Sequence, residues 1–149
     1  MEKLSYSLDK NSNTGMLLWL SANKWQRELN KVLLKHSLTH VQFFLLTGLY
    51  ELKLAKKHTT QMTLSTHAGI DKMMTSKVIR SLEEKKLVKR TVDKVDKRAI
   101  QLELTSFGTQ LLKKAAVSAS KFDLAYFKVL ADKQKSLNKK LNRLIEEAK

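Results

Sequence analysis

In the middle of this chain the period of the apolar side chains changes from helical to strand-like, and this change most constrains the fold. Thr60 is a candidate N-cap for a short helix over residues 60–67 with an inward Leu64. Gly69 then supplies a turn, because glycine accepts backbone angles that other residues resist. A second helix starts at Asp71, whose carboxylate lies near the positive N-terminal end. The stretch predicts two short helices joined by a tight turn.

The helix that starts at Asp71 has two distinct faces. Its apolar face can dock on the preceding helix and consists of Met74, Val78 and Leu82, with Ile79 beside them. Helical spacing places the opposite, solvent-facing side at Met73, Ser76, Lys77, Arg80 and Glu84, with Lys72 and Glu83 at its margin. This outer face can enter the major groove of DNA.

A β-hairpin is predicted after the second helix. Residues 87–92 and 99–104 carry β-branched or apolar side chains in partial alternation. The connection between them, D-K-V-D-K-R at 93–98, is polar and has cations at both ends. Helix, turn, helix and a basic-tipped hairpin, in this order, are the parts of a winged helix-turn-helix module that binds DNA.

Three sequence motifs make this prediction more specific. They are the run A-G-I-D-K-M-M-T-S-K-V-I-R-S-L-E-E-K-K-L-V-K-R, the wing sequence D-K-R at 96–98, and L-x-L-T-x-x-G at 102–108. Their combination closely resembles the MarR family of bacterial and archaeal transcriptional regulators. The resemblance implies a mainly α (α+β) fold: a winged helix-turn-helix with long N- and C-terminal dimerisation helices and a two-stranded wing.

Helices are also predicted on both sides of this module. Residues 14–36 have an apolar seam, and Thr39 with Gln42 forms a capping box that starts a helix running to about residue 56. Thr105 is a plausible N-cap for a long helix that extends to about Leu130, and Asp132 can cap a last one. The seam of this last helix consists of Leu137, Leu141, Leu144 and Ala148.

The resemblance implies one MarR-like domain over residues 1–149. In it, residues 39–104 form the DNA-binding lobe, and residues 14–36 and 105–149 form the dimerisation helices. The apolar seams of the terminal helices could also close the core of a monomer. Members of the family are homodimers, and a two-fold dimer places two recognition helices about 34 Å apart in successive major grooves.

The net charge favours a polyanionic partner, nucleic acid before a membrane surface. It is +15, from 29 Lys and Arg against 14 Asp and Glu. Residues 72–98 alone hold ten Lys or Arg against four Asp or Glu, a net of +6. The alternative is a solvated basic surface without a partner.

Eight residues are predicted to contact DNA. On the helix, Lys77 and Arg80 can bond guanine edges or phosphates, and Ser76 can contact base or backbone. Met73 can touch a thymine methyl group or pack under the wing. The full set is Lys72, Met73, Ser76, Lys77, Arg80, Lys94, Lys97 and Arg98. The resemblance assigns Arg98 to the minor groove and gives Asp96 the role of steadying the loop.

The resemblance also implies a small aromatic or anionic effector, bound between the dimer helices and the lobe. Five aromatic residues lie on helices that could line such a cavity: Trp19, Trp25, Phe43, Phe44 and Tyr50. Residues of these types more often form plain core than line a ligand cavity.

Metal binding and catalysis are not expected. The capping box separates His36 from His40, and His58 and His67 have no carboxylate nearby in the sequence, so we expect neither a metal nor another cofactor. No catalytic motif is present, and the absence of cysteine excludes thiol-based redox sensing. No segment is long and apolar enough for a signal or a membrane span, which predicts a cytoplasmic, nucleoid-associated protein.

The sequence therefore predicts a DNA-binding transcriptional regulator, not an enzyme. Our hypothesis is a ligand-responsive repressor that acts as a homodimer on a pseudo-palindromic operator. Two alternatives remain: an architectural protein that binds double-stranded DNA without sequence preference, and a regulator controlled by a protein partner.

Overall fold

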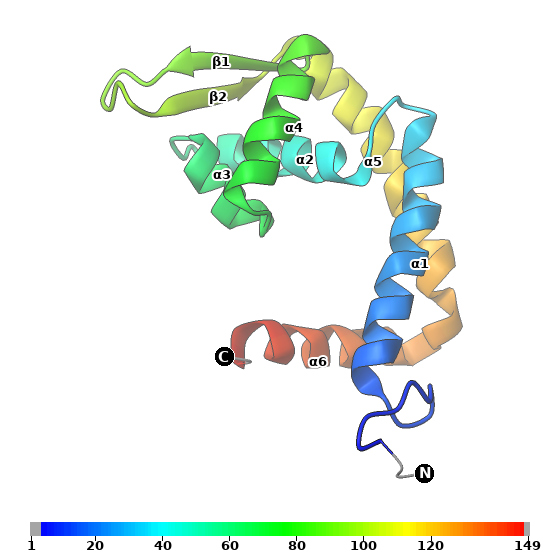
Figure 1. Ribbon diagram of the computed structural model, residues 1–149. Helices are drawn as coiled ribbons and strands as arrows, with labels where there is room; N and C mark the ends of the chain where they lie inside the picture. The colour runs from blue at the N-terminus through cyan, green and yellow to red at the C-terminus, as the bar shows by residue number, and fades with distance from the viewer. Residues whose placement is uncertain (1–3, 148–149) are drawn as a thin grey trace.

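The computed structural model describes residues 4–147 and is mainly helical, with one two-stranded sheet (Figure 1). In chain order the elements are α1 (Thr14–Leu34), α2 (His40–Leu54), α3 (Gln61–Ala68), α4 (Lys72–Glu84), β1 (Val88–Val92), β2 (Ile100–Leu104), α5 (Ser106–Phe127), a 3₁₀ segment η1 (Lys128–Lys133) and α6 (Gln134–Glu147). This arrangement confirms the predicted fold class. Within residues 4–147, no helix has both the length and the apolar character needed to cross a membrane.

The lobe consists of α2, α3, α4 and the hairpin, packed around leucine and isoleucine side chains. Leu45, Leu46, Leu64, Ile79 and Leu82 are fully buried at its centre. Two of the predicted helix starts are confirmed: Thr39 and Gln42 form a capping box on α2, and Asp71 accepts a hydrogen bond from the Met74 amide on α4. Gly69 ends α3 in the left-handed conformation (φ 65°).

The buried edge of α4 differs in part from the prediction. Thr75, Ile79 and Leu82 are fully buried, whereas Met74 is 43% exposed. Thr75 tolerates burial because its hydroxyl donates to the Asp71 carbonyl oxygen, 2.8 Å away. The buried face of α4 therefore passes through Thr75 and Ile79, one residue further along the chain than the predicted positions Met74 and Val78.

The hairpin is anchored to the lobe by the segment before α3. The antiparallel register pairs Val88 with Leu104 and Val92 with Ile100. The Leu102 amide donates to the Thr59 carbonyl oxygen at 2.9 Å, and Thr60 forms a bridge to Gln101. Because these bonds join the wing to the start of α3, the wing and the helix-turn-helix have a fixed relative position.

The L-T-x-x-G motif joins the hairpin to α5. Thr105 caps α5 by accepting from the Gly108 amide, and its own hydroxyl donates to the Lys86 carbonyl oxygen at 2.8 Å. A Cβ at Gly108 would lie 2.1 Å from the Leu87 carbonyl oxygen. Glycine is required here because the first turn of α5 lies directly against the chain that enters β1.

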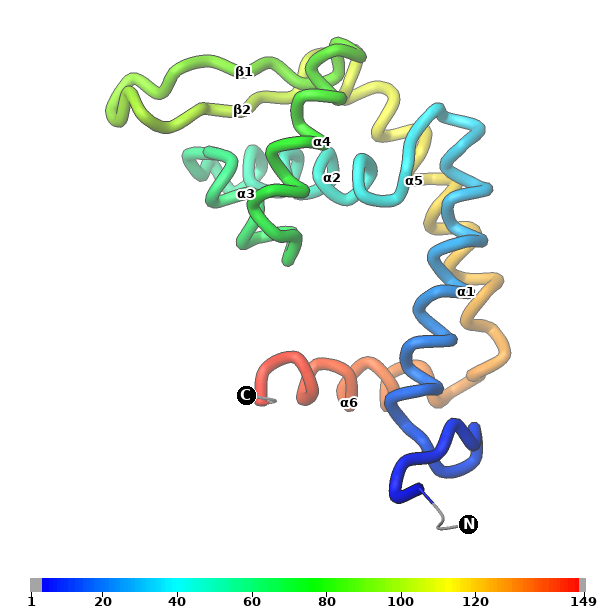
Figure 2. The backbone as a smooth tube through the Cα atoms, in the orientation of Figure 1, coloured from blue at the N-terminus to red at the C-terminus, as the bar shows by residue number. Residues whose placement is uncertain are grey.

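Outside the lobe, α1 and α5 run side by side, and α6 projects away from them (Figure 2). The helix predicted to reach Leu130 stops at Phe127, and the chain turns at Ala131 (φ 48°, ψ −123°). No residue of α6 over 134–147 is buried. Ala148, the last residue of the predicted seam, lies outside the described residues.

Candidate DNA-binding interface

The outer face of α4 is open to solvent in the single chain. A shallow hollow of about 520 Å³ is lined by Met73, Ser76, Lys77, Arg80, Ser81 and Glu84. The structure therefore brings together the four predicted contacts that lie along this face. Met73 is 85% exposed, so the alternative in which it packs under the wing is wrong.

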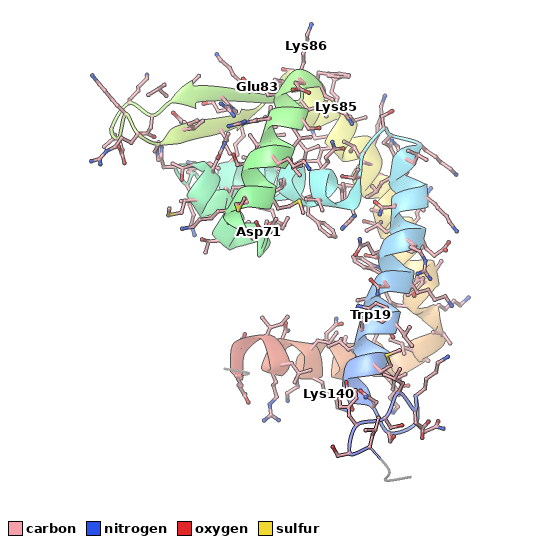
Figure 3. The ribbon with its side chains drawn as sticks, in the orientation of Figure 1. Trp19, Asp71, Glu83, Lys85, Lys86 and Lys140 are labelled. Carbon is pink, nitrogen blue, oxygen red and sulfur yellow. The ribbon has the colours of Figure 1, made fainter. Side chains whose placement is uncertain are left out.

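Two of the ten cations of residues 72–98 are used inside the protein. Lys85 Nζ donates to the Ser37 carbonyl oxygen at 2.7 Å, which ties the end of α4 to the loop between α1 and α2. Arg90 Nε on β1 lies 3.2 Å from Glu83 Oε2 on α4. Figure 3 shows Glu83 and Lys85 near the end of α4 that meets the hairpin, and Asp71 at the opposite end. These two cations therefore fix α4 in the lobe.

The wing turn is organised by Asp93, which the sequence analysis did not single out. This carboxylate is 2% exposed and accepts hydrogen bonds from the Val95 and Asp96 amides at 2.7 and 2.8 Å. Its other oxygen contacts the His58 imidazole. The Asp96 amide above all, together with the Val95 amide and His58, lowers the pKa of Asp93 below its usual value, although burial opposes the shift.

Asp96 and Arg98 form a second, more exposed part of the wing turn. Asp96 Oδ1 accepts from the Arg98 amide at 3.0 Å and lies 3.9 Å from Arg98 Nε. The Arg98 side chain is 97% exposed, and Lys94 and Lys97 are exposed beside it. The three predicted wing cations thus project into solvent from a turn whose backbone two aspartates hold.

Two histidines have carboxylate partners that come from distant parts of the sequence. His58 contacts Asp93, and His67 Nε2 lies 2.7 Å from Glu51 Oε2. Both partners are distant in sequence, so inspection of neighbouring residues could not find them. Within the described part of the chain, no group of three potential ligand residues is placed to hold a metal ion.

The five aromatic residues proposed for an effector cavity do not form one group. Trp25 stacks on Phe44 with ring centroids 6.1 Å apart, and its indole N–H donates to Asp123 at 2.9 Å. Phe43 is buried beside Phe44, and Tyr50 is half-buried farther along α2. Trp19 is 61% exposed on the half of α1 farthest from the lobe (Figure 3). A single chain therefore gathers only Trp25, Phe43 and Phe44.

The helix-turn-helix, the paired strands and the exposed basic turn define a winged helix-turn-helix protein. A model of the MarR family matches residues 38–100. The uncharacterized HTH-type transcriptional regulator YdcH of Bacillus subtilis (strain 168) is 35% identical over 128 residues, which cover 86% of this chain and 87% of that protein. The chain belongs to the MarR family. Membership of a family of transcriptional regulators confirms that it is not an enzyme.

Solved structures show the same fold at lower sequence identity. The transcriptional repressor CouR of Rhodococcus jostii RHA1, bound to a 23-mer DNA duplex, superposes with a TM-score of 0.82 at 22% identity and covers 96% of this chain and 100% of its own. BpsR of Bordetella bronchiseptica, whose DNA binding is regulated by 6-hydroxynicotinic acid, has a TM-score of 0.82 at 20% identity, with coverage of 97% and 100%.

Proposed function

We propose that this chain is a sequence-specific regulator of transcription that binds a pseudo-palindromic operator as a homodimer. The observation that carries the proposal is the open outer face of α4, with Ser76, Lys77 and Arg80 exposed or half-exposed along it. Side chains of these types bond base edges and phosphates in a major groove. CouR, which shares the fold, is a repressor with DNA bound.

The homodimer is supported by α6, which lacks cover in the single chain. Leu144 is 51% and Ile145 79% exposed on this helix, and Trp19 and Val129 are also exposed in the terminal part of the fold. Large apolar side chains exposed on a helix that projects from the protein favour an interface at this helix. A second copy, with the same exposed helices, would cover it and place two copies of α4 on one duplex.

Control by an effector is a further part of the proposal. A small aromatic or anionic molecule would bind where the terminal helices of a dimer meet the lobe, beside Trp25 and Phe44. The structural similarity to BpsR supports an aromatic acid as the effector, because 6-hydroxynicotinic acid regulates the DNA binding of BpsR. A rise in melting temperature with one member of a panel of aromatic acids would test it, since a ligand of the native state stabilises that state.

Selection of bound duplexes from a random pool tests the DNA-binding proposal. We expect recovered sequences with inverted half-sites, and binding to them that persists in excess random duplex. The charge of +15 supports one competing function, that of an architectural DNA-binding protein. Recovery of duplexes without a shared sequence, with binding abolished by random competitor, would favour that function instead.

A further inference from the structure

A separate hollow of about 380 Å³ lies between the helix-turn-helix and the wing. Its lining comes from three elements: Gln61 and Met62 from the first turn of α3, Lys72 from the first turn of α4, and Arg98 and Ile100 from the wing. The hollow therefore lies between the first turns of α3 and α4 on one side and the wing on the other. Lys72 and Arg98 bring positive charge to it from two sides.

The geometry points to a seat for one sugar–phosphate strand of the duplex, held by Lys72 and by Gln61 of α3. This inference rests on the proposed DNA binding by α4 and the wing. Adjacent major and minor grooves of B-DNA are separated by a single sugar–phosphate strand. With α4 in the major groove and Arg98 in the neighbouring minor groove, this strand must pass between the two elements. The hollow is the space between them.

The lining has the chemistry that a sugar–phosphate strand requires. Lys72 offers a compact ammonium charge, and the Gln61 side-chain amide offers a neutral N–H donor for a phosphate oxygen. Met62 is 58% exposed and, with the half-buried Ile100, presents apolar surface for a deoxyribose. The strand is thus contacted through groups that every nucleotide shares.

One lining residue opposes a phosphate. Asp96 also borders the hollow, and its carboxylate would repel the negative charge of the strand. The Arg98 amide donates to the Asp96 carboxylate at 3.0 Å, and Arg98 Nε lies 3.9 Å from it. Arg98 therefore offsets the negative charge of Asp96 on the wing side of the hollow. The phosphate is therefore expected on the opposite side, next to Lys72 and Gln61.

The seat adds α3 to the elements that contact DNA. The contacts predicted from the sequence lay only on α4 and the wing. A phosphate contact by Gln61 carries no sequence information, but it fixes how α4 is oriented in the groove. Gln61→Ala should therefore lower affinity severalfold for the selected operator and for random duplex alike. Gln110→Ala and Lys113→Ala, exposed positions on α5, are matched controls that should bind as the wild-type protein does.

A methylphosphonate scan tests the seat directly. The wild-type protein and Lys72→Ala are titrated with operator duplexes in which each phosphate of one half-site and its flank is replaced in turn by an uncharged methylphosphonate. We expect one or two linkages, between the half-site and its flank, to cost the wild-type protein about tenfold in affinity. Replacement of the same linkages should hardly change the affinity of Lys72→Ala. Replacement of any other linkage should lower the affinity of both proteins by the same factor.

Two results would overturn the seat while DNA binding stands. One is an equal loss for both proteins at every linkage, and the other is coupling of Lys72 to a linkage inside the half-site. Circular dichroism of each variant must match that of the wild-type protein. Failure of the proposed function gives a different result, because selection would then recover no shared half-site, and no operator would exist for the scan.

Discussion

His58, in the segment before α3, contacts the buried carboxylate of Asp93 at the start of the wing turn. Asp93 also accepts hydrogen bonds from the Val95 and Asp96 amides, so this one side chain closes the turn and ties it to the lobe. The two residues are 35 positions apart in the chain. The position of the wing cations relative to α4 therefore depends on this contact as well as on the pairing of β1 with β2.

Replacement of Asp93 should destabilise the protein in a pH-dependent way. The lowered pKa of Asp93 means that its ionised form favours the folded state. This contribution is fully present above the unfolded-state pKa of about 4 and is lost as pH falls through the lower folded-state value. We expect Asp93→Asn to melt below the wild-type protein at pH 7, and the difference to shrink at pH 3.

Asp93→Ala gives a second measurement of the same contact. It should melt lower than Asp93→Asn at pH 7, because alanine also loses the acceptor for the two amides. A difference between the wild-type protein and Asp93→Asn that stayed constant from pH 7 to pH 3 would show that the charge of Asp93 does not stabilise the fold.

Gly108→Ala should be strongly destabilising, because the new Cβ would lie 2.1 Å from a backbone oxygen of Leu87. We expect a loss of about 1–3 kcal/mol in urea unfolding, as for overpacked sites. Gly15→Ala is the matched control, since Gly15 also lies in the first turn of a helix and its Cβ would come no closer than 3.5 Å to the Asn13 side chain. It should be neutral or stabilising, and an equal loss in both variants would contradict the packing argument.

Local features of this fold could be predicted from the sequence because each has a short-range cause. The capping box at Thr39 needs only Gln42 three residues later, and the Gly69 turn needs only glycine. The exposed face of α4 follows from helical spacing, and the structure places Lys77 and Arg80 there. Direct contact of these side chains with DNA remains a prediction.

Other features could not be predicted because their causes are long-range. Asp93 looks like an ordinary polar turn residue until His58 is brought beside it. In the sequence, Lys85 and Arg90 resemble further DNA-facing cations. In the structure, Lys85 donates to the Ser37 carbonyl oxygen and Arg90 pairs with Glu83. The one available signal for Asp93 was its place at the start of a turn, where aspartate often accepts backbone amides.

Leu144→Gln should dissociate the proposed dimer. The Leu144 side chain is half exposed in the single chain, so the substitution costs little there, but it would remove apolar contact with a second copy. We expect sedimentation to show a shift towards monomer and weaker operator binding. Asn142→Gln, on the same helix, is the control and should remain dimeric. An unchanged dimer for Leu144→Gln would mean that this part of α6 does not form the interface.

Affinity for the operator should fall steeply with salt. Residues 72–98 have a net charge of +6, and a dimer presents two such segments. With roughly six to ten phosphates neutralised, log affinity should fall against log salt with a slope of about −5 to −9. Lys85→Ala should leave this slope unchanged, because Lys85 is bound to the α1–α2 loop. A slope near zero would contradict binding through phosphates.

The last prediction separates base reading by α4 from groove binding by the wing. Lys77→Ala and Arg80→Ala are compared on one operator. The variant that loses a base contact should lose about 1–3 kcal/mol of binding free energy per half-site and should show a weaker preference at particular base pairs. Arg98→Ala should instead weaken binding most on operators with A·T-rich flanks, since a narrow minor groove attracts arginine through its negative potential. The preference within the half-site should stay intact.

Arg98→Lys should recover only part of the loss, because a compact ammonium is more strongly hydrated than guanidinium and costs more to desolvate in the groove. The Arg98 side chain is almost fully exposed, so circular dichroism and melting temperature should not change in either variant. Asp96 accepts the Arg98 amide, a backbone bond that both substitutions keep. If Arg98→Ala bound like the wild-type protein on every flank, with the fold intact, α4 alone would read the DNA and the wing would not contact the minor groove.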